Sequence, residues 1–150
     1  MRIGLISDTH GLLRPEAKAF LSGCDAIVHA GDIGDPDILT ELRMLAPVTA
    51  VRGNNDGGAW ADALNETELL RVAGFHIYAI HDLTQLRLEP SAAGIHAVVS
   101  GHSHKPVVEK RGSVLFVNPG SAGPRRFKLP VAAGEITVRD AALSARTVEL

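Results

Sequence analysis

The first third of the chain alternates short apolar runs with two segments that begin at a proline. The apolar runs are Ile3–Ile6, Asp25–His29 and Pro47–Val51. Pro15–Leu21 and Pro36–Leu45 lie between them, and a helix tolerates proline in its first turn. Short buried strands that alternate with helices are typical of parallel strands joined by crossovers. The pattern therefore predicts three parallel strands and two helices in this part of the chain.

The remaining chain favours antiparallel pairing, because pairs of strand-like runs flank short turns. The predicted hairpins join Glu68–Val72 to His76–Ile80, Pro106–Glu109 to Val114–Val117, and Glu135–Arg139 to Ser144–Leu150. We also predict a helix over Thr84–Ala93, which Pro90 could shorten, and a buried strand over Ala97–Ser100. The whole pattern predicts an α/β fold in which two mixed sheets pack together with helices outside.

The composition predicts a globular chain and argues against nucleic acids and membranes as partners. The chain has 150 residues, the size of one domain, and 45% of them are apolar, so we treat residues 1–150 as a single domain. The formal net charge is −2 and the chain lacks an extended basic groove, so nucleic acid is not an expected partner. Cys24 is the only cysteine, and no apolar run is long enough for a signal sequence or a membrane span. We therefore expect a cytoplasmic protein that does not bind a membrane.

Seven side chains with metal-binding atoms stand just after predicted strands. They are Asp8, His10, Asp32, Asn54, His81, His102 and His104. The steps from His10 to Asp32 and from Asp32 to Asn54 are 22 residues each, which is close to the length of one strand–helix unit. Side chains that follow successive strands of an α/β sheet meet at the carboxyl ends of the strands, where active sites form. We therefore expect these seven side chains to converge on one patch of loops.

The types of donor atom predict a pair of divalent metal ions. Imidazole suits Fe, Ni or Zn, and carboxylate oxygen suits Mn. Mn is the first choice, and Fe, Ni and Zn are the alternatives. Seven ligands of which one is shared leave open positions around the ions, as in a catalytic site. Two ions can activate water and hold both ends of a displacement at phosphorus, so the donors predict a phosphoesterase.

Each candidate ligand also has a simpler explanation when it is considered alone. Asp8 and Asp32 could cap a turn or a helix, and His81 could be an ordinary histidine at a strand end. A metal site explains all seven positions together, whereas the simpler explanations require seven coincidences at one edge of the sheet. Three further histidines fit no ligand position, and we predict structural or exposed roles for His29, His76 and His96.

The candidate ligands belong to a series of short motifs. In chain order the motifs are Asp8-x-His10, Gly31-Asp32, Gly53-Asn54-Asn55-Asp56, His81 and Gly101-His102-Ser103-His104. The series resembles the signature of the calcineurin-like metallophosphoesterase superfamily. The short chain and the sequence Asn118-Pro119-Gly120-Ser121 resemble its small prokaryotic phosphodiesterase branch, the YfcE type. This resemblance implies a four-layer double β-sandwich flanked by helices.

The resemblance also implies which residues hold each metal ion. The first ion would be held by Asp8, His10, Asp32 and His104. The second would be held by Asp32 as the bridging ligand, Asn54, His81 and His102. A hydroxide that bridges the two ions would attack the phosphorus atom. The turn Asn118–Ser121 is expected to support the site.

Two positions depart from the pattern of the family. Asn55 stands where many members carry a catalytic histidine, and an amide cannot act as a general acid. We therefore expect activity on diesters, or on esters with good leaving groups. Asp82 follows His81 where the branch has glycine, and its carboxylate could orient a ligand or repel an anionic substrate. Arg125 and Arg126 are candidates for contact with the substrate phosphate.

The function predicted from these residues is a metal-dependent phosphodiesterase that acts on a small phosphate ester. One alternative is a non-catalytic scaffold that binds proteins, as a related retromer subunit does. Another is a phosphomonoesterase or nucleotide phosphatase that uses the same metal site. The seven intact ligand positions favour an enzyme over the scaffold. The sequence leaves the natural substrate and the presence of a homodimer open.

Overall fold

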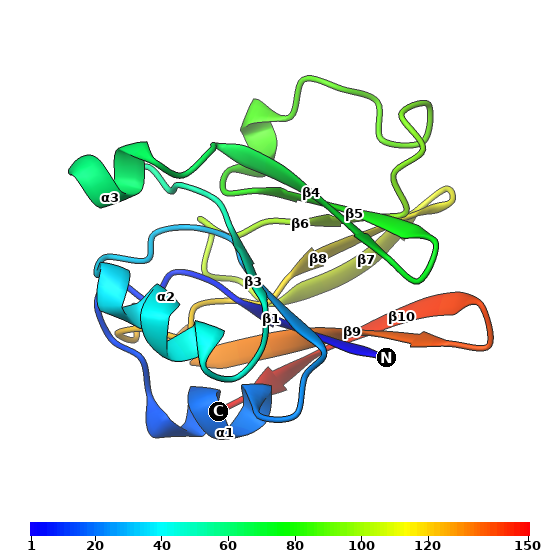
Figure 1. The fold of residues 1–150 in the computed structure, drawn as a ribbon. Helices are drawn as coiled ribbons and strands as arrows, with labels where there is room; N and C mark the ends of the chain where they lie inside the picture. The colour runs from blue at the N-terminus through cyan, green and yellow to red at the C-terminus, as the bar shows by residue number, and fades with distance from the viewer.

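The computed structural model describes residues 1–150, which form two five-stranded mixed sheets that pack face to face (Figure 1). The first sheet contains β1 (Arg2–Ile6), β2 (Ala26–His29), β3 (Val48–Ala50), β9 (Ala132–Arg139) and β10 (Ala142–Glu149), in the order β10-β9-β1-β2-β3. The second contains β4 (Thr67–Val72), β5 (Phe75–Ile80), β6 (Ala97–Val99), β7 (Val107–Arg111) and β8 (Val114–Asn118), in the order β4-β5-β6-β8-β7. These are the strands that the sequence predicts, with bounds shifted by one to three residues.

The parallel part of the first sheet confirms the predicted alternation of strands and helices. β1 pairs with β2 and β2 with β3 in parallel register, and the connections run through α1 (Pro15–Leu21) and α2 (Pro36–Arg43). Both helices begin at the predicted proline. Asp35 caps α2, because its carboxylate accepts the N–H of Asp37 at 2.9 Å. Asp32 is therefore not the cap of this helix.

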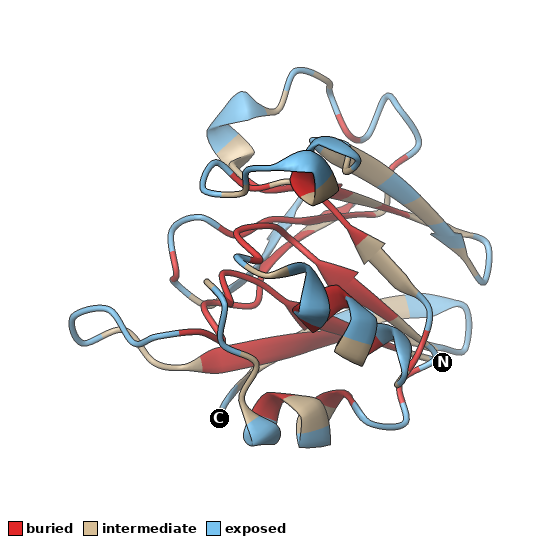
Figure 2. Cartoon of the chain, turned by 60° about the vertical axis from the view of Figure 1, so that its left-hand side comes forward, coloured by how far each residue is buried: buried red, intermediate tan, exposed pale blue.

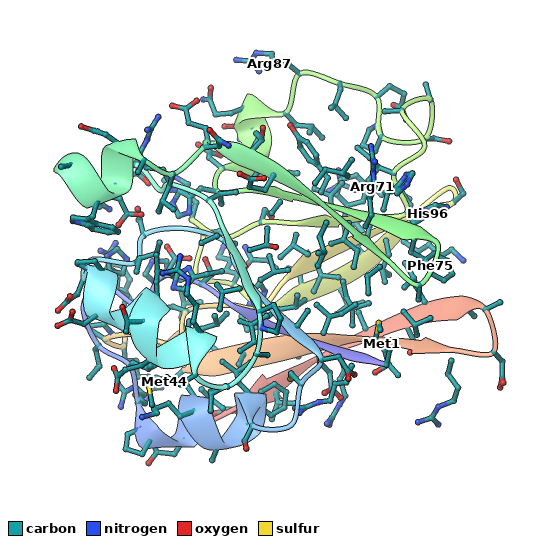
Figure 3. The ribbon with its side chains drawn as sticks, in the orientation of Figure 1. Met1, Met44, Arg71, Phe75, Arg87 and His96 are labelled. Atoms are coloured by element: carbon teal, nitrogen blue, oxygen red, sulfur yellow. The ribbon has the colours of Figure 1, made fainter.

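The main core lies between the two sheets. Ile3, Leu5 and Val28 of the first sheet pack in one cluster with Ile77 and Val99 of the second, and all of them are buried. Figure 2 shows the buried strands at the centre, and Figure 3 shows side chains filling the space between the sheets. Burial of one such side chain stabilises the fold by about 1.5–3 kcal/mol relative to exposure. The sheets therefore hold one another in place, and with them the loops at their edges.

The two outer faces of the sandwich are covered differently. On the first sheet, Ile6 packs against Leu21 of α1 and Leu42 of α2 in a second apolar cluster. A short helix that the sequence did not predict, α3 (Ala59–Asp62), adds Trp60 to the same cluster. None of the helices has the length and the hydrophobicity that crossing a membrane requires.

The predicted helix over Thr84–Ala93 is wrong. The structure has only the single 3-10 turn η1 (Leu83–Gln85), followed by irregular chain up to β6. Pro90 lacks an N–H and disfavours helical backbone at the residue before it, so the segment cannot continue as a regular helix. Leu83 and Leu88 nevertheless pack against the outer face of the second sheet. The segment thus forms the fourth layer of the sandwich in place of a helix.

Candidate metal centre

The seven predicted ligands come together at one edge of the sandwich, where loops from both sheets meet. The loops after β1, β2 and β3 supply the ligands from Asp8 to Asn54, and the loops after β5 and β6 supply the three from His81 to His104. The structure places each of the seven within 4.0 Å of another member of the set. The convergence predicted from the strand–helix spacing is therefore present.

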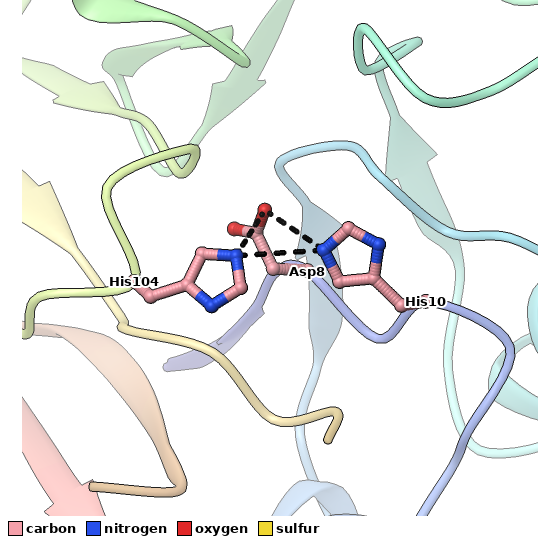
Figure 4. A group of neighbouring side chains, drawn as sticks. All are labelled: Asp8, His10 and His104. Atoms are coloured by element: carbon pink, nitrogen blue, oxygen red, sulfur yellow. Dashed lines mark hydrogen bonds and ion pairs between the residues drawn. The ribbon is translucent and has the colours of Figure 1, made fainter. Parts of the chain in front are cut away.

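Asp8, His10 and His104 form the first group (Figure 4). Nε2 of His104 lies 3.3 Å from Oδ1 of Asp8, and Nε2 of His10 lies 3.7 Å from the same oxygen. The other oxygen, Oδ2, accepts hydrogen bonds from the Ser7 hydroxyl at 2.6 Å and from the N–H of His102 at 3.1 Å. Those two bonds hold the carboxylate so that Oδ1 faces the histidines.

Asp8, Asp32 and His81 form the second group, and all three are buried. Oδ2 of Asp32 lies 3.3 Å from Nε2 of His81 and 3.7 Å from Nε2 of His10, so it is between the two groups. Oδ1 of Asn54 lies 2.9 Å from Nε2 of His81 and 3.2 Å from Nδ1 of His102. Two carboxylates therefore lie in the middle of the set, with imidazoles on both sides.

Backbone strain is concentrated in these loops. Five of the seven candidate ligands have positive φ angles, between 45° and 70°: Asp8, His10, Asp32, His102 and His104. This region is rare for residues other than glycine, and each such residue costs on the order of 1–3 kcal/mol when its backbone is strained. A Cβ on Gly53 would lie 2.1 Å from the backbone nitrogen of Asp32. Glycine is required at position 53 because the loops after β2 and β3 approach each other closely there.

Burial and mutual contacts shift the pKa values of three candidate ligands. Burial raises the pKa of Asp32, but hydrogen bonds from His81 and Asn55 lower it further, and the net pKa is below the ordinary range. Burial lowers the pKa of His81, whereas its bonds to Asp32 and to the Ala30 carbonyl raise it, so the net pKa is above its ordinary value. Burial lowers the pKa of His104 and so favours the neutral imidazole that metals bind.

Residues beside the ligands hold the loops in position. Asn118 donates from Nδ2 to the Gly101 carbonyl at 2.9 Å, which fixes the loop that carries His102 and His104. Ser121 donates to the Asp8 carbonyl at 3.0 Å. The turn Asn118–Ser121 thus makes the supporting contacts that were expected of it.

His29 is a supporting residue whose place in the site the sequence did not reveal. Its Nδ1 accepts the N–H of Gly31 at 3.1 Å, and its Nε2 lies 3.0 Å from the Thr9 hydroxyl, which donates to the Ile33 carbonyl. Full burial lowers the pKa of His29 to about 3, so the ring is neutral. The sequence signal that could have indicated this supporting role is the position of His29 at the end of β2, just before Gly31-Asp32.

Comparison with known proteins agrees with the geometry. The family model described as the calcineurin-like phosphoesterase superfamily domain matches residues 1–140. The chain belongs to this superfamily. It is 41% identical over 142 residues to a probable metallophosphoesterase of Methanothermobacter thermautotrophicus, a match that covers 87% of this chain and 82% of that protein. It is 30% identical to phosphodiesterase YfcE of Escherichia coli K12 in an alignment 152 positions long. This match covers 81% of this chain and 79% of that protein.

Solved structures show the same architecture. Vps29 of Chaetomium thermophilum superposes with a TM-score of 0.80 at 17% identity, and the match covers 100% of this chain and 97% of that one. At this identity the likeness shows the fold alone. The predicted superfamily and the predicted α/β double sandwich are both confirmed.

The residues of this calcineurin-like phosphoesterase fit the metal ions on which the superfamily depends. Oδ1 of Asp8 is buried and has no hydrogen-bond partner, yet three histidine nitrogens lie 3.3, 3.7 and 4.0 Å from it. A buried carboxylate oxygen without a partner is costly, and a bound cation removes that cost. The set also lacks thiolates, as expected for metals that prefer oxygen and imidazole ligands.

The positions that depart from the family pattern now have locations. Asn55 donates from its backbone N–H and its Nδ2 to the two oxygens of Asp32, at 2.8 and 2.9 Å. Asp82 accepts the N–H and hydroxyl of Thr84 with Oδ1, and its Oδ2 lies 3.9 Å from Nε2 of His102. Asn55 thus orients a candidate ligand, and Asp82 faces another.

The two arginines predicted to contact substrate lie on an exposed loop. The side chain of Arg125 donates to the Leu129 carbonyl at 3.1 Å, within the same loop. The positive charge of Arg126 contributes, after burial, to the lowered pKa of His104. A contact of either arginine with a substrate phosphate stays a prediction.

Proposed function

We propose that this calcineurin-like phosphoesterase hydrolyses small phosphodiesters at two divalent metal ions. The observation that carries the proposal is the buried, unpartnered Oδ1 of Asp8 with three imidazole nitrogens within 4.0 Å. The ligands of the first ion would be Asp8, His10, Asp32 and His104, and those of the second Asp32, Asn54, His81 and His102. Mn is the proposed metal, with Fe, Ni and Zn as alternatives, because the donors are imidazole, carboxylate and amide oxygen.

The residues of the chain contribute orientation and polarity. When bound, two divalent ions supply a nucleophile from water at neutral pH and positive charge beside the phosphate oxygens. Asn55 holds both oxygens of Asp32, so this carboxylate cannot rotate away from the centre. The Ala30 carbonyl lies 2.7 Å from Nδ1 of His81 and fixes that ring with Nε2 toward the centre. Each candidate ligand so held needs no reorganisation when an ion or substrate binds.

The proposed preference for diesters follows from Asn55. Its amide carries no proton that it can give to a leaving oxygen. Its side chain is also occupied with Asp32. An ester whose leaving group needs no protonation is therefore favoured, and an ester that must release a strongly basic alkoxide is not. The protein named phosphodiesterase YfcE among the relatives supports the same preference.

The test compares bis-p-nitrophenyl phosphate with p-nitrophenyl phosphate after metal is removed and Mn, Fe, Ni, Zn or Mg is restored separately. Asp32→Asn changes a candidate ligand with little change in shape, and His76→Gln is the control at a histidine outside the cluster, bonded to the Gly94 carbonyl. We expect metal-dependent cleavage of the diester, faster than that of the monoester, in the wild type and in His76→Gln but not in Asp32→Asn. Faster cleavage of the monoester would identify a phosphomonoesterase, and folded protein without turnover would favour the scaffold.

A further inference from the structure

A pocket of about 650 Å³ opens beside the proposed ligands of the second ion, of which Asn54 and His81 belong to its lining. One side is the outer face of the second sheet, where Thr67 of β4 and Ile80 of β5 are paired neighbours. The opposite side comes from the segment after β5, through Gln85 and other residues near it. A pocket of this size accommodates an organic group far larger than a phosphate.

The segment after β5 lines the pocket as an irregular chain. The lining includes Asp82, Gln85, Arg87 and Leu88 of this segment, together with His81 just after β5. Tyr78, Ile80 and Leu88 provide the apolar part of the lining. Figure 3 shows Arg87 on the outer side of this segment, at the top of the molecule.

The charged residues of the lining balance one another. Arg52 and Arg87 carry positive charge, and Glu66 and Asp82 carry negative charge. Arg52 is engaged, since it donates to Glu66 at 3.1 Å and to the Leu64 carbonyl at 3.2 Å. Arg87 donates to the Thr84 carbonyl at 3.3 Å. The pocket therefore offers apolar and hydrogen-bonding surface, and its two positive and two negative side chains leave no net positive charge for a second phosphate.

We propose that this pocket binds one ester group of the substrate, an uncharged organic alcohol of about nucleoside size. The inference rests on the proposed function, because a phosphate at the metal centre would place one of its two ester groups beside Asn54 and His81. Apolar contact with Tyr78 and Leu88 and hydrogen bonds from the polar lining would hold that group. A diester whose second group carries a terminal phosphate gains no net attraction, since the charges of Glu66 and Asp82 offset those of Arg52 and Arg87.

The experiment uses three diesters that share p-nitrophenolate as leaving group. The other ester group is methyl in the first, which is small, and thymidine 5′ in the second, which is large and neutral. In the third it is 2-phosphoethyl, which is charged. Thr67→Tyr and Gln85→Trp each fill the pocket from a different side. Leu69→Tyr is the matched control, two residues along β4 from Thr67, 41% exposed and outside the pocket. The measured quantity is kcat/KM for each ester, relative to that for the methyl ester.

In the wild type we expect the thymidine ester to exceed the methyl ester by at least about tenfold, the gain from roughly 1.4 kcal/mol of extra binding. Both filling variants lose this ratio, and Leu69→Tyr keeps it. If all esters are cleaved but neither filling variant changes the ratio of the thymidine ester to the methyl ester, the proposed role of the pocket is overturned and the proposed function stands. A phosphoethyl ester cleaved as well as the thymidine ester overturns the preference for an uncharged group. Absence of cleavage of every ester overturns the proposed function, and this inference with it.

Discussion

The carboxylate of Asp82 provides a test of how the metal centre is organised. Nδ1 of His102 faces Oδ1 of Asn54 at 3.2 Å, on the side of the candidate ligands, and Nε2 faces Oδ2 of Asp82 at 3.9 Å. A carboxylate beside the outer nitrogen of a metal-binding histidine fixes the ring and makes it a stronger ligand. Asp82→Asn removes the charge with little change in shape. We expect it to weaken the binding of the second ion.

The size of the effect follows from distance and exposure. His102 would bind a metal as the neutral imidazole, so Asp82 would act through its contact with the outer ring nitrogen, and the loss of such a partner typically weakens metal binding by about 10- to 100-fold. The side chains of His102 and Asp82 are 47% and 27% exposed, so the lower end applies. The expected loss is therefore about 1.4 kcal/mol, which corresponds to an about tenfold larger dissociation constant for the second ion.

The assay is calorimetric titration of Mn²⁺ into metal-free protein, with the two binding steps fitted separately. Asp140→Asn makes the same change of charge on an exposed turn between β9 and β10, at a position with positive φ that asparagine also tolerates. We expect this control to bind both ions as the wild type does. A second-ion affinity in Asp82→Asn within twofold of the wild type refutes the argument. If the KM for a diester falls instead, Asp82 acts by repelling the substrate.

Three further predictions concern stability and the support of the site. Burial holds the pKa of His29 near 3 instead of 6.5, so the free energy of unfolding falls as the pH is lowered from 6.5 toward 3. In urea titrations across this range, the free energy of unfolding of His29→Gln should fall less steeply than that of the wild type, by up to about 1.4 kcal/mol per pH unit. Leu5→Ala should lower the free energy of unfolding by about 2–5 kcal/mol in the same assay, whereas Leu69→Ala at an exposed position should change it by less than about 0.5 kcal/mol. Asn118→Ala removes the bond to the Gly101 carbonyl; calorimetry should then show weaker metal binding, and unchanged affinity would mean that this loop is held by other contacts.

Much of the candidate metal centre could be predicted from the sequence because most of its residues stand directly after strands that the sequence itself indicates. Asp8, Asp32 and Asn54 each follow a short apolar strand, and strand order brings them to one edge. The donor types then indicate a metal without knowledge of any distance. The contacts of Asn55 and Asp82 are not local in this sense, since the same residues could equally have faced solvent. Only the folded loops show that they face Asp32 and His102.

The wrong helix over Thr84–Ala93 shows where pattern alone fails. Two leucines of this segment, Leu86 and Leu88, do pack against the apolar residues of the second sheet. Tertiary packing can use the same side chains on an irregular backbone, and Pro90 decides between the two. The pairing of β9 with β1 also lacked a local signal, because the hydrogen bonds join opposite ends of the sequence. Hydrophobic periodicity identifies a strand but not its distant neighbour.

That pairing constrains how the protein can be assembled during synthesis. β1 leaves the ribosome before the other nine strands of the two sheets, yet one of its edges stays bare until β9 has been made. His104 and the turn at Asn118 also come late, so the nascent chain holds incomplete ligand loops for most of that time. With the proposed ligand set, complete metal binding would have to wait until His104 has been made, and a bound ion would then join loops of both sheets. A growing chain that stalls early presents an open strand edge, the feature that chaperones and aggregates recognise.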